Sequence, residues 1–171
     1  MSATEDATQN LVRQVLEAAH GEYNRGVLEN DMAQVLAFYE KWAAPDFEER
    51  DNPRGHATNR EQMLALMAQA VASGNPGGSM TVLEATTGIA ELSVEGGRAI
   101  AVTTNKYRYQ QMDTHGWYGV KDKEHEVEMV GRWRQMWVKT DGGWRLQVNQ
   151  LLSTETHIDG VPFVPEHSQQ G

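Results

Sequence analysis

The chain has 171 residues, of which 15 are lysine or arginine and 24 are aspartate or glutamate, so its formal net charge is −9. This length suits one domain of about 150 residues. The absence of cysteine excludes disulfides, thiolate zinc sites and cysteine nucleophiles. An acidic chain without a basic run is a poor partner for nucleic acid or anionic lipid. Because the sequence has neither a membrane-length apolar run nor a signal-peptide pattern, we expect a cytoplasmic protein.

The N-terminal part of the chain carries two helical patterns. Residues 1–8 are polar, and we expect them to be disordered. From Asn10 to Gly26, apolar residues recur at helical spacing. Asp31 and Gln34 then have the spacing of a capping box, which predicts the start of a second helix. We expect this helix to end before the proline that follows it.

A short strand and a third helix come next. Residues 46–51 are predicted to be extended, and the loop after them contains a proline and a glycine. Thr58 and Glu61 have the spacing of another capping box, which predicts the start of the third helix. Residues 73–79 form a turn cluster. We do not expect a domain boundary there, because each half of the chain lacks the elements needed to cover its own apolar faces.

The second half of the chain is typical of a sheet. Two-residue turns at 96–97 and 141–142 predict two antiparallel hairpins. Between them, residues 111–124 lack clear periodicity, as expected for a lid, an interface or a disordered connection. We therefore predict one α+β domain over residues 9–155, with three N-terminal helices packed on a curved antiparallel sheet, followed by a C-terminal extension over 156–171.

Two glutamines fall on the predicted inner face of the second hairpin. Counting outward from its turn places Trp133 opposite Gln150, with Gln135 between Trp133 and Trp137 on the same face. A buried amide without a partner costs about 1–3 kcal/mol, so these amides need each other, a water or a ligand. Polar groups in an aromatic wall are typical of a small-molecule pocket. Alternatively, one or both amides lie near a strand end and contact solvent.

The first hairpin contributes further polar residues to the same predicted face. Counting from its turn pairs Ala90 with Thr103 and continues to Asn105 and Tyr107. We therefore include Asn105 and Tyr107 among the candidate ligand-binding residues.

The opposite face of the second hairpin mixes cationic and apolar residues. Arg132, Arg134 and Arg145 lie there beside Val130 and Met136. This composition is too apolar for bare solvent and too polar for a core, so we expect a homodimer through the outer sheet face. An alternative is an adaptor that binds peptides through the same arginines.

The strand at 46–51 carries the candidate catalytic base. Phe47, Glu49 and Asp51 share one side of it, and Asp51 ends the strand. A carboxylate at the rim of an apolar cavity suits a general base, because desolvation raises its pKa. Tyr23, on the apolar side of the first helix, is the candidate hydrogen-bond donor. The alternatives are that Asp51 caps the following turn and that the Tyr23 hydroxyl bonds a backbone carbonyl.

Metal and cofactor motifs are missing from the sequence. The six histidines show no metal-ligand spacing, and no dinucleotide, phosphate-loop or serine-hydrolase signature is present. We therefore expect neither a metal site nor a cofactor.

Three segments resemble the nuclear transport factor 2-like superfamily, which includes the SnoaL-like polyketide cyclases and the ketosteroid isomerases. They are NDMAQVLAFY at 30–39, APDFEERDNP at 44–53 and WVKTDGGWRLQ at 137–147. The resemblance covers about residues 8–155. It implies a cone-shaped α+β barrel.

The resemblance also implies roles for two residues. In ketosteroid isomerases, an aspartate before the turn is the general base and a tyrosine on the first helix donates to the developing oxyanion. Asp51 and Tyr23 fall at these positions. The chain departs from that pattern in the segment EKWA, which lengthens the link to the strand, and in having no second carboxylic acid that we can place.

These observations predict a protein that binds a small, largely apolar molecule in an internal pocket. If it is an enzyme, Asp51 moves a proton at carbon, as in an isomerase, cyclase or dehydratase, without a cofactor. The alternative is a non-catalytic module of the same fold that binds a ligand or dimerises.

Overall fold

The computed structural model describes residues 3–51, 55–74 and 80–164. Its helices are α1 (Ala3–Leu28), α2 (Met32–Trp42) and α3 (Arg60–Ala72). Its strands are β1 (Ala43–Asp51), β2 (His56–Asn59), β3 (Thr81–Glu95), β4 (Arg98–Asp113), β5 (Lys123–Thr140), β6 (Gly143–Ile158) and β7 (Val161–Phe163). None of the helices in these ranges is long and apolar enough to span a membrane.

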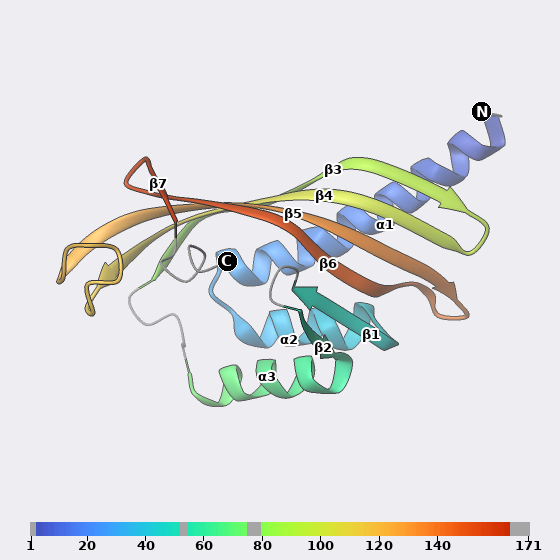
Figure 1. Ribbon diagram of the computed structural model, residues 1–171. Helices are drawn as coiled ribbons and strands as arrows, with labels where there is room; N and C mark the ends of the chain where they lie inside the picture. Colours follow the sequence, from blue (N-terminus) through green and yellow to red (C-terminus); the bar gives the residue numbers. More distant parts are fainter. Residues whose placement is uncertain (1–2, 52–54, 75–79, 165–171) are drawn as a thin grey trace.

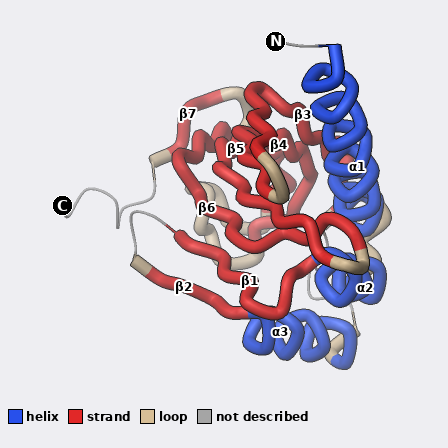
Figure 2. The backbone as a smooth tube through the Cα atoms, turned by 90° about the vertical axis from the view of Figure 1, so that its right-hand side faces the viewer, coloured by secondary structure: helices blue, strands red, loops and turns tan. Residues whose placement is uncertain are grey.

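The strands form one seven-stranded sheet in the order β2-β1-β6-β5-β4-β3, and β7 pairs with β6. All neighbours are antiparallel except β1 and β6, which are parallel. The three helices lie on one side of the sheet (Figure 1). In the turned view, β1 and β2 form a lower wall and β3–β5 an upper one (Figure 2). This is the predicted cone-shaped α+β architecture.

The core lies between the helices and the concave side of the sheet. Trp137, Phe47 and Leu16 are each at most 1 % exposed, and they come from a late strand, an early strand and the first helix. Burying a side chain of this size contributes about 1.5–3 kcal/mol. The two halves of the sequence therefore share one core, which is why the turn at 73–79, part of which lies outside the described residues, does not separate two domains.

Two of the helix starts differ from the predicted capping boxes. Asp31 caps α2 by accepting from the Gln34 backbone at 3.2 Å, but the Gln34 side chain donates to the carbonyl of Glu22 instead of closing the box. The box of α3 lies one residue later than predicted, at Asn59 and Gln62. The prediction at Thr58 was wrong because Thr58 belongs to β2, where it pairs with β1.

The described residues near both ends of the chain belong to regular elements, whereas residues 1–2 and 165–171 of the predicted terminal segments lie outside the described residues. Helix α1 begins at Ala3, and its first turn carries two acidic residues, which favour a helix N-terminus. Strand β6 continues to Ile158 and pairs with β7. Strands β4 and β5 also extend into the predicted connection, so that only residues 114–122 remain outside them.

The predicted strand register holds near each turn and fails beyond a bulge. Trp137 lies opposite Leu146, as predicted. Strand β6 then inserts Gln147, so Gln135 lies opposite Asn149 and not opposite Val148. In β3, Ala90 is the extra residue, and Ile89 takes its predicted place opposite Thr103. A bulge puts two residues against one, and every later side chain changes face.

Candidate functional site

A carboxylate of β1 points into the interior. Phe47, which is 1 % exposed, sets the inward side of this strand, and alternation places Glu49 and Asp51 on the same side. The parallel register with β6 aligns Glu49 with Asn149, whose side chain is hydrogen-bonded to the Glu49 carboxylate. Burial raises the pKa of Glu49, the hydrogen bond from Asn149 opposes that rise, and the negative charge of Asp51 adds to it.

Three tyrosines from different elements lie close enough to this carboxylate for its charge to act on them. Tyr23 comes from α1, Tyr39 from α2 and Tyr107 from β4, and the negative charge of Glu49 acts on all of them. Burial raises the pKa of Tyr23 to about 12, and it also raises the pKa values of Tyr39 and Tyr107. All three hydroxyls therefore keep their protons at neutral pH and can act as donors.

The hydroxyl of Tyr23 lies beside that of Tyr39. Its ring packs edge-on against Tyr39, with centroids 6.2 Å apart, and the two hydroxyls are hydrogen-bonded. Burial is the largest effect on both hydroxyls and raises the pKa of each.

A second polar group links α1 to β3 and β4. The Tyr107 hydroxyl lies 3.5 Å from Asn24 Oδ1, and Asn24 Nδ2 donates to Thr87 Oγ1 at 3.0 Å. Asn105 is hydrogen-bonded to Tyr107 and lowers the pKa of its hydroxyl, opposing the larger effect of burial. Asn105 Oδ1 and Thr103 Oγ1 are buried and have no hydrogen-bond partner among the described residues. Unpartnered buried polar atoms are rare in folded proteins, so they indicate a place for water or a ligand.

A third group connects α1 with β5 and β6. His20 Nε2 lies 2.8 Å from Gln135 Oε1, which also accepts from Trp137 Nε1 at 3.2 Å. Gln135 Nε2 donates to Asn149 Oδ1 at 3.2 Å. Burial lowers the pKa of His20, so this histidine is neutral at neutral pH. Through Asn149, the chain of hydrogen bonds reaches Glu49.

The structure brings together most of the residues singled out in the sequence. Tyr23, Tyr107, Asn105 and Gln135 all contribute to these internal groups. Gln150 does not, because the bulge in β6 places it opposite Arg134, on the other face from Gln135. The predicted convergence of Gln135 and Gln150 is therefore wrong, and Asn149 takes the second position.

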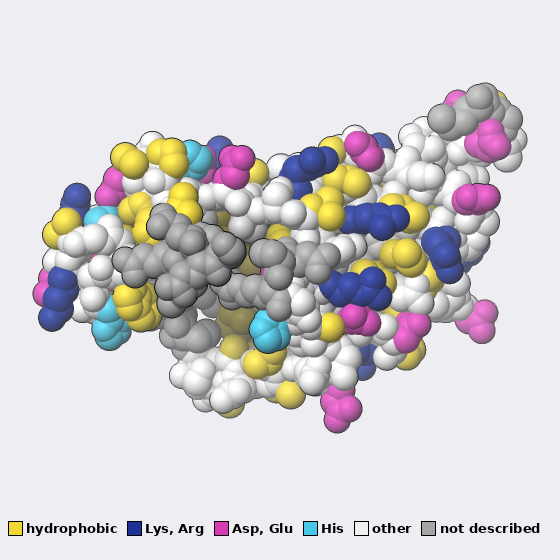
Figure 3. Space-filling model, in the orientation of Figure 1, with side chains coloured by type: hydrophobic (Ala, Val, Ile, Leu, Met, Phe, Trp, Pro, Cys, Tyr) yellow, Lys and Arg dark blue, Asp and Glu magenta, His cyan; other side chains and the backbone are white. Residues whose placement is uncertain are grey.

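Asp51 and Trp133 lie beside these groups. Asp51 ends β1, is partly buried and lies opposite His56 and Leu151 in the sheet. Trp133 is partly buried and lies opposite Thr103. Figure 3 shows that the molecule is hollowed between the sheet and α3, with hydrophobic side chains on the inner wall.

Sequence reasoning did not select several residues of this interior, among them His20, Asn24, Tyr39, Glu49 and Asn149. The alternation with Phe47 could have identified Glu49, and the apolar stripe of the second helix included Tyr39. No local signal marks Asn149, because its inward position depends on the bulge. Among the described residues, no cluster of three histidine or acidic side chains could hold a metal ion.

Solved structures share this arrangement of helices and sheet. No protein-family model and no curated protein sequence matches the chain. A nuclear transport factor 2-like superfamily protein from Salmonella enterica is 17 % identical, with a TM-score of 0.52, and the match covers 95 % of this chain and 98 % of that one. A hexachlorocyclohexane dehydrochlorinase is 10 % identical, with a TM-score of 0.59 and coverage of 94 % and 98 %. A candidate scytalone dehydratase from Novosphingobium aromaticivorans is 15 % identical, with a TM-score of 0.59 and coverage of 88 % and 90 %.

At these identities the likeness establishes the fold alone. The chain has the nuclear transport factor 2-like fold, as its sequence resemblance predicted. The similar structures include a dehydrochlorinase and a candidate dehydratase, so the fold is compatible with catalysis as well as with ligand binding.

Proposed function

We propose that the interior binds a small, largely apolar molecule and that Glu49 moves a proton at one of its carbon atoms. The observation that carries this proposal is the position of Glu49, an inward carboxylate with a raised pKa whose charge acts on three buried tyrosine hydroxyls. A base with a raised pKa holds an abstracted proton more firmly, and nearby donors stabilise the charge that forms.

The proposed reaction begins at a carbon next to a carbonyl group. The Glu49 carboxylate removes a proton from this carbon, and the bonding electrons move onto the carbonyl oxygen. That oxygen accepts a hydrogen bond from the hydroxyl of Tyr23. Return of the proton from Glu49 to another carbon completes an isomerisation, whereas its transfer to a departing hydroxyl group releases water. Neither course requires a cofactor.

The sequence predicts that Asp51 is the base, and the assay described below tests that assignment as well. Asp51 lies on the same side of β1, where its charge raises the pKa of Glu49. We assign the proton transfer to Glu49 because its charge acts on the three tyrosines, and we assign to Asp51 the role of strengthening that base.

A general probe can test these assignments without knowledge of the natural substrate. In 5-nitrobenzisoxazole, removal of the C3 proton breaks the N–O bond and releases a coloured cyanophenolate. A carboxylate in an apolar site accelerates this elimination, because it has lost part of its hydration shell. We expect the elimination to be faster with the wild-type protein than with an equal concentration of acetate. Glu49→Gln should lower the rate about a hundredfold or more.

The variants distinguish the two carboxylates. Asp51→Asn should retain the elimination and move its pH profile to lower pH, since it removes a negative charge next to Glu49. Glu48→Gln is the matched control, because Glu48 pairs with Arg50 at 2.9 Å and lies on the other side of β1. A wild-type rate no greater than that of acetate would overturn the proposal, as would an unchanged rate in Glu49→Gln. Loss of the reaction in Asp51→Asn alone would transfer the role of base to Asp51.

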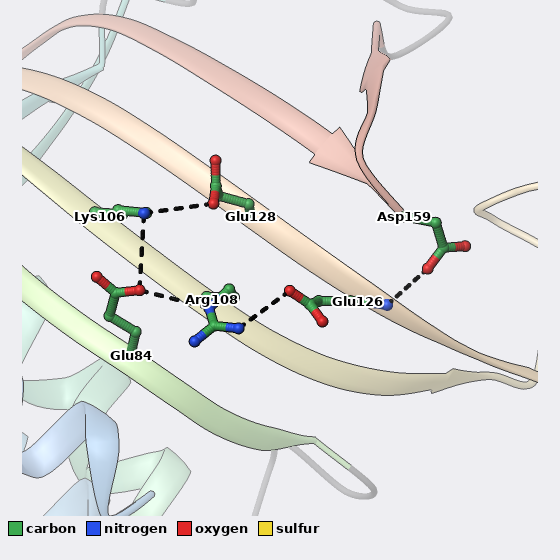
Figure 4. A network of polar contacts seen from close by, with 6 residues as sticks. All are labelled: Glu84, Lys106, Arg108, Glu126, Glu128 and Asp159. Carbon is green, nitrogen blue, oxygen red and sulfur yellow. Dashed lines mark hydrogen bonds and ion pairs between the residues drawn. The ribbon is translucent and has the colours of Figure 1, made fainter.

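We also propose a homodimer through the outer face of the sheet. The helices leave this face uncovered (Figure 1), and Val130, Met136 and Val138 are only partly buried there. At the other end of the face, charged side chains of β3, β4 and β5 form a network of ion pairs (Figure 4). Exposed pairs of this kind are well solvated, so we place the interface around Met136 and Val138.

The dimer is tested by light scattering at micromolar concentration. Met136→Glu with Val138→Glu should dissociate it, because two carboxylates would be buried without partners. Val71→Glu, on the exposed side of α3, is the control and should not change the mass. A wild-type monomer would contradict the proposal.

A further inference from the structure

A chain of hydrogen bonds crosses the interior and ends at Glu49. It begins at Gln135 Oε1, which two ring nitrogens contact. His20 Nε2 lies 2.8 Å from this oxygen and Trp137 Nε1 lies 3.2 Å from it. It continues from Gln135 Nε2 to Asn149 Oδ1 at 3.2 Å. The last step joins Asn149 to Glu49, its neighbour in the register of β6 with β1.

The indole of Trp137 determines the direction of this chain. An indole nitrogen can only donate, so it requires the oxygen of the Gln135 amide to face it. His20 Nε2 contacts the same oxygen and must therefore carry a proton. Because His20 is buried and neutral, its proton lies on Nε2 and its Nδ1 is bare. In agreement, His20 Nδ1 has no partner among the described residues.

The same direction continues to the carboxylate. Since the Gln135 amide nitrogen donates to Asn149 Oδ1, the Asn149 amide nitrogen is left to face Glu49. A donor at this place favours an ionised Glu49 that accepts the hydrogen bond.

If donors and acceptors were exchanged along the chain, each of its hydrogen bonds could still form except one. With both amides turned, a protonated Glu49 would donate to Asn149, Asn149 would donate to Gln135, and Gln135 would donate to a histidine protonated on Nδ1. The amide nitrogen of Gln135 would then meet the indole N–H of Trp137, and two donors would face each other. Trp137 alone excludes this arrangement.

We propose that Trp137 is a positioning residue whose indole N–H fixes the direction of the chain and keeps Glu49 an accepting carboxylate. The proposal rests on the proposed function only in the use made of Glu49 as a base. Asp51 on β1 also acts on Glu49, and the charge of Glu49 acts on three tyrosines, which are Tyr23 on α1, Tyr39 on α2 and Tyr107 on β4. None of them is part of the chain.

NMR of the full-length protein tests this proposal. The wild-type nitrogen shifts of His20 should show the neutral form protonated on Nε2. In Trp137→Phe, a population of the Nδ1 form should appear, and the proton affinity of Glu49 should rise about tenfold, as expected for a weakened hydrogen bond to a charged group. Trp42→Phe is the matched control. Its ring packs 6.1 Å from that of Trp137, but its indole donates to Glu22. It should change neither quantity.

Two results would overturn the proposal. One is a wild-type His20 that is protonated on Nδ1, and this measurement remains valid even if Trp137→Phe does not fold. The other is a folded Trp137→Phe in which His20 and Glu49 titrate as they do in Trp42→Phe. Because both readouts need no substrate, they are independent of the elimination assay. Failure of that assay with a confirmed His20 form would refute the catalytic role of Glu49 but not the hydrogen-bond chain.

Discussion

Replacing Glu49 by glutamine should stabilise the folded protein at neutral pH. Burial and the charge of Asp51 raise the pKa of Glu49 in the folded state above its ordinary value of 4.5. Between these two values the folded state binds more protons than the unfolded chain, so the free energy of unfolding falls as the pH rises. Glutamine does not titrate, so Glu49→Gln removes this pH-dependent loss of stability. It keeps an oxygen that can accept a hydrogen bond from Asn149.

The magnitude can be worked from the spacing of the two carboxylates. Alternate residues of a strand are about 6.6 Å apart. At that distance, two negative charges repel by about 2.5 kcal/mol for an effective dielectric constant of about 20. Asp51 is only partly buried, so solvent screening reduces this value to about 1 kcal/mol. For a domain of this size, that corresponds to a melting temperature about 2–4 °C higher.

Urea denaturation at a series of pH values measures the effect. The stability difference between Glu49→Gln and the wild type should be small below the ordinary pKa of Glu49 and should grow as the pH rises through the folded-state value. Glu48→Gln lies in the same strand on the outer side and should show no such growth. If Glu49→Gln destabilised the protein equally at all pH values, Glu49 would be an ordinary structural partner of Asn149, and the reasoning would be refuted.

Three further predictions concern the scaffold. Asn59→Ala should lower the free energy of unfolding by about 1 kcal/mol through loss of the cap of α3, whereas Thr58→Ala should cost less, and equal costs in urea denaturation would contradict the observed cap. Leu16→Ala should cost about 2–5 kcal/mol in the same assay, because its side chain is fully buried, and a cost below 1 kcal/mol would contradict this packing. Asp113→Ala should increase amide exchange at Trp117, whose N–H it accepts at 2.9 Å, and unchanged exchange would show that other contacts hold the loop.

Periodicity and turn chemistry predicted the elements that define the fold. The three helices, the strand carrying Asp51 and both hairpins follow from spacing and from two glycine-containing turns. The cap of α3 shows the limit of local reasoning. Thr58 with Glu61 and Asn59 with Gln62 both have the capping-box spacing. Pairing between Glu49 and Thr58 in the sheet takes Thr58 into β2, and this non-local contact leaves Asn59 as the cap.

The chain ends were harder to predict for a related reason. Residues before Asn10 contain no apolar stripe, yet α1 extends to Ala3, where its residues are largely exposed. Each residue added to an existing helix gains one hydrogen bond, so a helix can continue without a packed face. Strand β7 likewise depends on its partner β6, and Phe163 gains an edge-on contact with Tyr118 from the loop at 114–122.

The bulge in β6 links the failed register prediction to the proposed chemistry. If β6 had no bulge, Gln147 would pair with Met136, Val148 would lie opposite Gln135, and Asn149 would face outward. Glu49 would then lose its amide donor, and a buried carboxylate without such a partner would take up a proton. With the bulge, Asn149 faces both Gln135 and Glu49, and the carboxylate can remain ionised among the tyrosines. Bulges commonly redirect a side chain beside an active site, and here the redirected residue is the one that connects the aromatic core to the candidate base.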